Sequence, residues 1–112
     1  MKFLLSFFAA ALLSANVSAG VIFQDNFDAE AGGAGSSSLN YSAFSNWGVS
    51  DGTVDVVSNG GWGIGCVGGA GKCIDLDGST GNAGTLTSTL LSLAAGNYTL
   101  SFDISGNQRG GE

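Results

Sequence analysis

The stretch GNYTLSFDISG, residues 96–106, alternates apolar and polar side chains between two glycines. Neighbouring residues of a β-strand point to opposite faces of a sheet. One face of this stretch carries the apolar side chains, which are those of Tyr98, Leu100, Phe102 and Ile104. The other face carries the polar ones, which are those of Thr99, Ser101, Asp103 and Ser105. The pattern predicts a half-buried strand, and it is the clearest such pattern in the chain.

The preceding sequence repeats this alternation in shorter pieces. Weaker strands are expected at residues 21–27, 46–50, 53–58, 73–77 and 85–93. The dipeptide Asp51-Gly52 is a strong turn signal, and it predicts a hairpin between the strands on either side of it. No part of residues 20–112 keeps a helical apolar period for three turns. Short strands separated by turns predict an all-β sandwich or barrel.

The first residues, MKFLLSFFAAALLSANVSAG, have the layout of an export signal. Lys2 precedes an apolar run over residues 3–13, and small residues follow up to Ala19. This layout predicts a signal peptide over residues 1–19, with cleavage after Ala19 or, as a weaker alternative, after Ala15. The apolar run is shorter than the roughly 20 residues that span a bilayer, which disfavours a membrane anchor. We therefore expect a secreted or cell-surface protein whose single domain, residues 20–112, has no membrane span.

The composition excludes several classes of function. The 112 residues include no His, so a Ser-His-Asp triad and an imidazole metal site are both absent. Nine acidic and three basic residues give a formal charge of −6, which argues against nucleic-acid binding. Asp75 and Asp77 could be read as a glycosidase pair, but neighbouring outward residues of one strand rarely flank a cleft. The sequence predicts no enzyme activity.

Cys66 and Cys73 are the only cysteines, and they enclose the short loop CVGGAGKC. A zinc site is disfavoured because two thiols without His do not complete a tetrahedron. Export would place the pair where a disulfide persists. A Cys66–Cys73 disulfide is therefore expected.

Residues 26–110 resemble the N-terminal part of secreted bacterial PEP-CTERM proteins. The most specific pieces are NWGVSDGTVDVV, residues 46–57, and DLDGSTGNAG, residues 75–84. The resemblance implies a jelly-roll, galactose-binding-like β-sandwich that is exported and associated with exopolysaccharide or the cell surface. Further strands and a Pro-Glu-Pro sorting tail follow in that family, whereas this sequence has no Pro. The chain is accordingly expected to be an N-terminal fragment with an incomplete sandwich.

A calcium site is one possible role for the acidic residues. Strand alternation places the carboxylates of Asp75 and Asp77 on one face, and Asp28 and Glu30 could supply further oxygens. The resemblance adds that galactose-binding-like sandwiches often carry a structural Ca²⁺ near their N-terminal end. The alternative is that these residues form a solvated outer face.

Sugar binding is the second possible role, and Trp62 is its best candidate. It stands between two glycines in the Gly-rich loop of residues 59–71, where a core position is not expected. An indole stacks on the C–H faces of sugars, and Asn59 in the same loop could supply polar contacts. The alternative is that Trp62 folds back over the core.

Together these features predict a non-catalytic exported surface or extracellular-matrix protein that contacts polysaccharide. Two alternatives remain open at this stage. The chain could be a carbohydrate-binding module of a larger secreted hydrolase, or a purely structural surface protein without a ligand.

Overall fold

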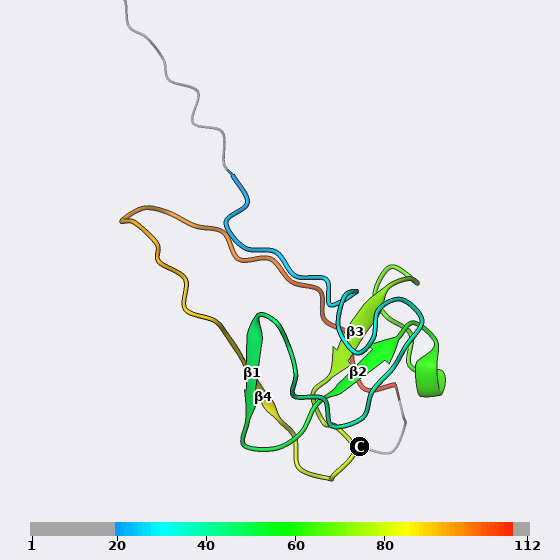
Figure 1. Cartoon of the computed structure of the whole chain (residues 1–112). Helices are drawn as coiled ribbons and strands as arrows, with labels where there is room; N and C mark the ends of the chain where they lie inside the picture. Colours follow the sequence, from blue (N-terminus) through cyan, green and yellow to red (C-terminus); the bar gives the residue numbers. More distant parts are fainter. Residues whose placement is uncertain (1–19, 109–112) are drawn as a thin grey trace, which may run out of the picture.

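A computed structural model describes residues 20–108, and Figure 1 shows their course. The expected signal peptide, residues 1–19, lies outside the described residues. The regular elements are four strands and one turn of 3₁₀-helix, which are β1 (Trp47–Ser50), β2 (Asp55–Ser58), η1 (Gly61–Gly63), β3 (Lys72–Asp75) and β4 (Thr85–Ser88). Residues 20–108 contain no α-helix, so the fold class is all-β as predicted. Within the same residues, no helix is long and apolar enough to cross a membrane.

The four strands form two antiparallel pairs, β1 with β4 and β2 with β3 (Figure 1). Trp47 is opposite Ser88 in the first pair, and Asp55 is opposite Asp75 in the second. The predicted hairpin between residues 46–50 and 53–58 is therefore wrong. The chain does turn at Asp51-Gly52, but Thr53 then bridges to Ala83 and donates its N–H to the Asn82 carbonyl at 3.0 Å.

Gly52 explains why the chain leaves the turn in this direction. A Cβ atom at this position would lie 2.3 Å from the carbonyl oxygens of Asn82 and Ala83. Only glycine allows the two backbones to approach so closely. The turn thus brings residues 52–54 against residues 82–84 rather than back onto β1.

A small aromatic and aliphatic core lies between the two sheets. Its buried members are Phe44, Val54 and Val56. Partly buried side chains pack around them, which are those of Phe27, Ala31, Tyr41, Trp47, Val49, Ile74 and Leu86. Aromatic rings cover one side, with the rings of Tyr41 and Phe44 edge-to-face at 4.8 Å between centroids. Trp47 of β1 is thus packed against this core.

The disulfide between Cys66 and Cys73 is present, as predicted. Cys73 lies in β3 opposite Val57 of β2, and Cys66 is a buried residue of the loop that joins these strands. The two Cα atoms are 5.5 Å apart. The bridge therefore ties the returning half of the loop to the start of β3.

The last part of the described chain is not the strand that its sequence predicts. Residues 89–108 contain no strand, and all of them are exposed. Leu100 and Ile104 expose 85% and 82% of their surface. Figure 1 shows this segment, yellow to red, leaving β4, turning away from the sheets and returning. Alternation creates two different faces, but a strand also needs a neighbour for its backbone, and no strand of residues 20–108 pairs with residues 90–108.

Two other predicted strands are absent or shorter than expected, because part of their backbone has no strand beside it to pair with. Residues 21–27 form no strand, and only Thr85–Ser88 of the expected strand at 85–93 is paired. Phe23 nevertheless packs against Trp47, with ring centroids 5.6 Å apart. The two two-stranded sheets agree with an all-β fold but do not by themselves make up a jelly roll. The jelly-roll fold remains a prediction.

Candidate functional site

Trp62 lies at the tip of η1 in a strained backbone conformation. Its φ and ψ angles are 47° and 24°, in the left-handed region that bulky residues rarely adopt. Gly60 and Gly63 on either side also have positive φ values, of 81° and 83°. The Gly60 N–H donates to the Ile64 carbonyl at 2.8 Å, which closes the turn around the tryptophan. The indole is therefore held outward, and 49% of Trp62 is exposed.

Gly61 fixes this turn against the body of the protein. A Cβ atom there would lie 2.8 Å from Ser37 Oγ and 3.2 Å from Val57 Cγ1. The same Ser37 Oγ accepts the Ser58 N–H at 2.9 Å. The backbone beneath Trp62 consequently rests on the end of β2, and the indole does not fold back over the core.

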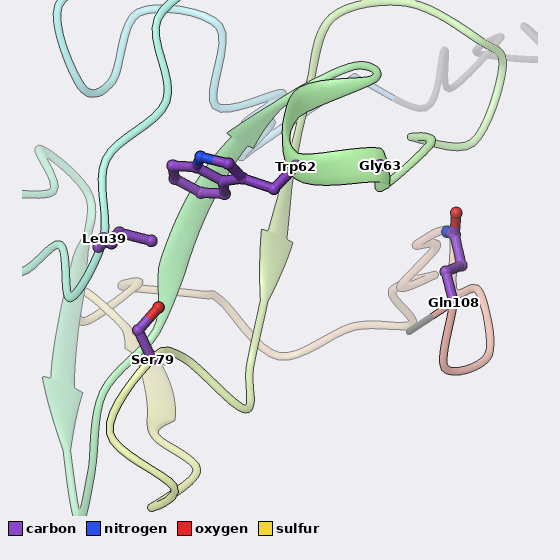
Figure 2. A pocket seen from close by; sticks show the side chains of 5 residues that line it. All are labelled: Leu39, Trp62, Gly63, Ser79 and Gln108. Carbon is purple, nitrogen blue, oxygen red and sulfur yellow. The ribbon is translucent and has the colours of Figure 1, made fainter. Parts of the chain in front are cut away.

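A surface pocket of about 570 Å³ opens beside Trp62. Five residues line it, namely Leu39, Trp62, Gly63, Ser79 and Gln108. Figure 2 shows the indole on the same side as Leu39 and Ser79, with Gln108 at the far end. The pocket thus combines a flat aromatic surface and an aliphatic side chain with two polar groups.

Ser79 is oriented by a carboxylate buried behind it. Its Oγ donates to Asp55 Oδ2 at 2.6 Å, while Asp55 Oδ1 accepts the Asn40 N–H at 2.7 Å. Asp55 has no exposed surface. Because the Ser79 proton is directed to Asp55, the lone pairs of Ser79 Oγ remain to accept a hydrogen bond from a ligand.

Gln108 forms a wall of the pocket rather than a free polar group. Its Oε1 accepts the Gly65 N–H and its Nε2 donates to the Gly65 carbonyl, both at 2.8 Å. Nε2 also donates to Ser105 Oγ at 3.2 Å. The side chain fastens the end of the described chain to the Gly-rich loop.

Asn59 is placed differently from the expectation of a ligand contact. Its Nδ2 donates to the Gly69 carbonyl at 2.8 Å, and its Oδ1 accepts the Cys66 N–H at 2.9 Å. It is not among the residues that line the Trp62 pocket. Asn59 therefore stabilises the loop that presents Trp62.

Sequence reasoning identified Trp62 but missed Leu39, Ser79 and Gln108. Ser79 had one local signal, because it follows Gly78 in the stretch DLDGSTGNAG. Gly78 has φ +61°, and a Cβ atom there would lie 2.4 Å from Thr53 Oγ1, so a tight turn must aim the next residue. Leu39 and Gln108 reach the pocket only through tertiary contacts, which leave no local pattern.

The four acidic residues considered for calcium are spread over separate contacts. Asp28 Oδ1 accepts the Lys72 N–H at 3.0 Å, whereas Asp75 Oδ1 accepts the Asp77 N–H at 3.2 Å. Glu30 is buried, and its two oxygens accept the Tyr41 hydroxyl at 3.1 Å and the Ser45 N–H at 3.0 Å. Among residues 20–108, no three acidic or cysteine side chains gather closely enough to hold a metal ion.

The positively charged side chain of Lys72 lies beside Glu30. Lys72 is buried, and its Nζ donates to the Glu30 carbonyl oxygen. The structure thus does not bring Asp28, Glu30, Asp75 and Asp77 together as one set of ligands. Calcium binding stays a prediction of the sequence.

Asp25 connects the N-terminal segment to the core. Its carboxylate accepts hydrogen bonds from Phe27 N at 2.9 Å and Asn46 Nδ2 at 3.1 Å. It also accepts one from Trp47 Nε1 at 2.8 Å. Burial raises the pKa of Asp25, but these three hydrogen bonds together outweigh burial and bring the pKa below its ordinary value of 3.8.

This lowered pKa predicts a pH dependence of stability. A carboxyl group with a lower pKa in the folded state stabilises the fold above its unfolded pKa, and that contribution is lost as the pH falls through the folded pKa. The Asp25→Asn variant should therefore lose less stability than the parent chain when the pH is lowered from neutral to below about 4. Thermal unfolding measured across this pH range tests the prediction. Parallel acid profiles for the two proteins would show that Asp25 does not contribute.

Comparison with known proteins adds no assignment. No family model matches the chain, and neither a curated protein nor a solved structure matches it.

Proposed function

We propose that this protein is a non-catalytic, exported surface or matrix protein that contacts polysaccharide through Trp62. The observation that carries the proposal is a half-exposed tryptophan in a left-handed backbone conformation beside a pocket. A left-handed conformation costs an L-residue about 1–2 kcal/mol, and such strain is concentrated at functional positions. Glycine would remove this cost, so the indole itself is the reason to keep tryptophan there.

The lining of the pocket supports binding rather than catalysis. None of its five residues has a side chain that titrates near neutral pH. The indole and Leu39 offer apolar surface, and Ser79 offers an oriented acceptor. These are the groups that hold a sugar ring, whose faces are apolar and whose rim carries hydroxyl groups.

The proposed fold is the jelly-roll, galactose-binding-like sandwich implied by the resemblance to exported PEP-CTERM proteins. The antiparallel β1–β4 and β2–β3 pairs and the core between them support this proposal. The Cys66–Cys73 disulfide also supports export, because such bonds persist outside the reducing cytoplasm.

Polysaccharide retention by the Trp62→Ala variant tests the function. The variant should bind at least about tenfold more weakly than the parent, because central tryptophans commonly contribute 1.4 kcal/mol or more to a binding interface. Affinity electrophoresis through gels that contain a panel of polysaccharides measures this loss.

Tyr98 provides a matched control. It is also an aromatic residue with 49% of its surface exposed, but it lies outside the Trp62 pocket. Tyr98→Ala should retain polysaccharide like the parent protein. Trp62→Gly relieves the backbone strain, so it should remain folded while losing retention. Equal retention by Trp62→Gly and the parent would show that Trp62 does not bind the polysaccharide, which would contradict the proposal.

A further inference from the structure

The charges of the described chain are distributed unevenly over its surface. Of the three basic residues, Lys2 and Arg109 lie outside residues 20–108, and Lys72 is buried. The exposed ionised side chains within residues 20–108 are therefore all carboxylates, including those of Asp28 and Asp77. This surface offers an incoming polymer negative charge only.

Among residues 20–108, no side chain that lines the Trp62 pocket carries a positive charge that could compensate a ligand's negative charge. Leu39, Trp62 and Gly63 carry no charge, and the Gln108 amide is already bonded to Gly65. The nearest polar partner of Ser79 is the carboxylate of Asp55. A uronate or sulfate group in the pocket would lose hydration, would find no cation among residues 20–108, and would approach the like charge of Asp55.

The direction of the hydrogen bond at Ser79 further limits which ligand groups the pocket can bind. Ser79 Oγ donates its proton to the buried Asp55, so it offers an acceptor to the pocket. A sugar hydroxyl can donate to this oxygen, whereas an ionised carboxylate can only accept. The adjoining indole and Leu39 match the apolar C–H face of a pyranose ring.

We propose that the Trp62 pocket selects an uncharged hexopyranose unit of a neutral polysaccharide and rejects uronate-bearing and sulfated polymers. This inference rests on the proposed function, because it specifies the ligand of the same pocket. It assigns stacking to Trp62 and acceptance of a sugar hydroxyl proton to Ser79.

The test compares neutral polysaccharides with acidic ones on the full chain, after export and purification. The neutral arm contains glucan, mannan and galactan, and the acidic arm contains alginate and polygalacturonate. Fully methyl-esterified polygalacturonate provides a matched pair, because it keeps the polymer backbone and removes the charge. At least one neutral polymer should be retained about tenfold more strongly than either acidic polymer, and methyl esterification should increase retention.

The dependence of retention on ionic strength and the retention of two variants test the same selectivity. Retention of the neutral polymer should hardly change between low and high ionic strength, because no ion pair is formed. Ser79→Ala should weaken neutral binding, whereas Arg109→Gln should leave it unchanged. Stronger retention of the acidic polymers that falls with salt, yet depends on Trp62, would overturn the selectivity and leave the proposed function standing. Retention of none of the polymers would overturn both.

Discussion

The Cys66→Ser, Cys73→Ser double variant should unfold about 10–20 °C below the parent protein, because the disulfide contributes about 2–3 kcal/mol to a domain of this size. The bridge spans seven positions of sequence and fastens a Gly-rich loop to β3. Without it, the unfolded loop gains conformational freedom that folding must then remove. The core beneath it is small, so few other contacts offset the loss.

The position of the bridge makes this effect local as well as global. Cys73 pairs with Val57 across the β2–β3 ladder, and the Asn59 N–H donates to the Gly71 carbonyl at 2.9 Å. Loss of the bridge should therefore loosen the turn that presents Trp62 and weaken polysaccharide retention too.

Differential scanning calorimetry measures the stability change. Treatment of the parent protein with a thiol reductant should lower its transition to that of the double variant. Val67→Ser is a suitable control, because Val67 lies in the same loop with 51% of its surface exposed. Coincident transitions for the parent, the double variant and Val67→Ser would show that the attachment of the loop to β3 does not depend on the disulfide.

The Asp55→Ala variant should lose about 2–4 kcal/mol of stability, because it removes a fully buried carboxylate that accepts two hydrogen bonds. Asp55 is fully buried, and its two oxygens accept hydrogen bonds from Asn40 N and Ser79 Oγ. These bonds tie two loops, far apart in sequence, to β2. Alanine also leaves a small cavity in place of the fully buried carboxyl group.

Two comparisons separate the hydrogen bonds from the packing. Asp55→Asn keeps the volume and one acceptor for the Asn40 N–H, while its amide can donate to Ser79 Oγ, so it should cost about 1 kcal/mol or less. Ser79→Ala removes only one of the two bonds and should also cost less than Asp55→Ala. Chemical denaturation gives the three values. Equal losses for Asp55→Ala and Asp55→Asn would mean that the carboxylate charge, rather than the two bonds, stabilises the fold.

The sequence predicted which segments become strands better than it predicted their partners. The strands at Trp47–Ser50 and Asp55–Ser58 fall within expected segments, since alternation is a local property. Their pairing in a hairpin was wrong, because the close approach of Gly52 to Ala83 directs the chain elsewhere. Pair choice depends on contacts between residues distant in sequence, which alternation does not encode.

In the candidate site, too, the sequence predicted local features but not contacts between distant residues. The flanking glycines indicated that Trp62 lies in an exposed loop, and its 49% exposure agrees with that interpretation. The acceptor role of Ser79 depends on the buried Asp55, which lies 24 positions earlier in the sequence. No local spacing predicts that pair. Residues 98–104 illustrate the converse, because a clear strand pattern does not form a strand without a neighbour.

The exposed stretch of residues 89–108 has a consequence for how long the protein survives. Proteases and holdase chaperones bind their substrates as extended, strand-like segments, and this segment is extended and exposed in the folded protein. Its alternating apolar side chains, such as those of Leu100 and Phe102, are the kind that such binding clefts accept. Degradation can therefore begin here without global unfolding. The lifetime of the molecule would then be set by what covers this segment, rather than by the free energy that holds the two sheets together.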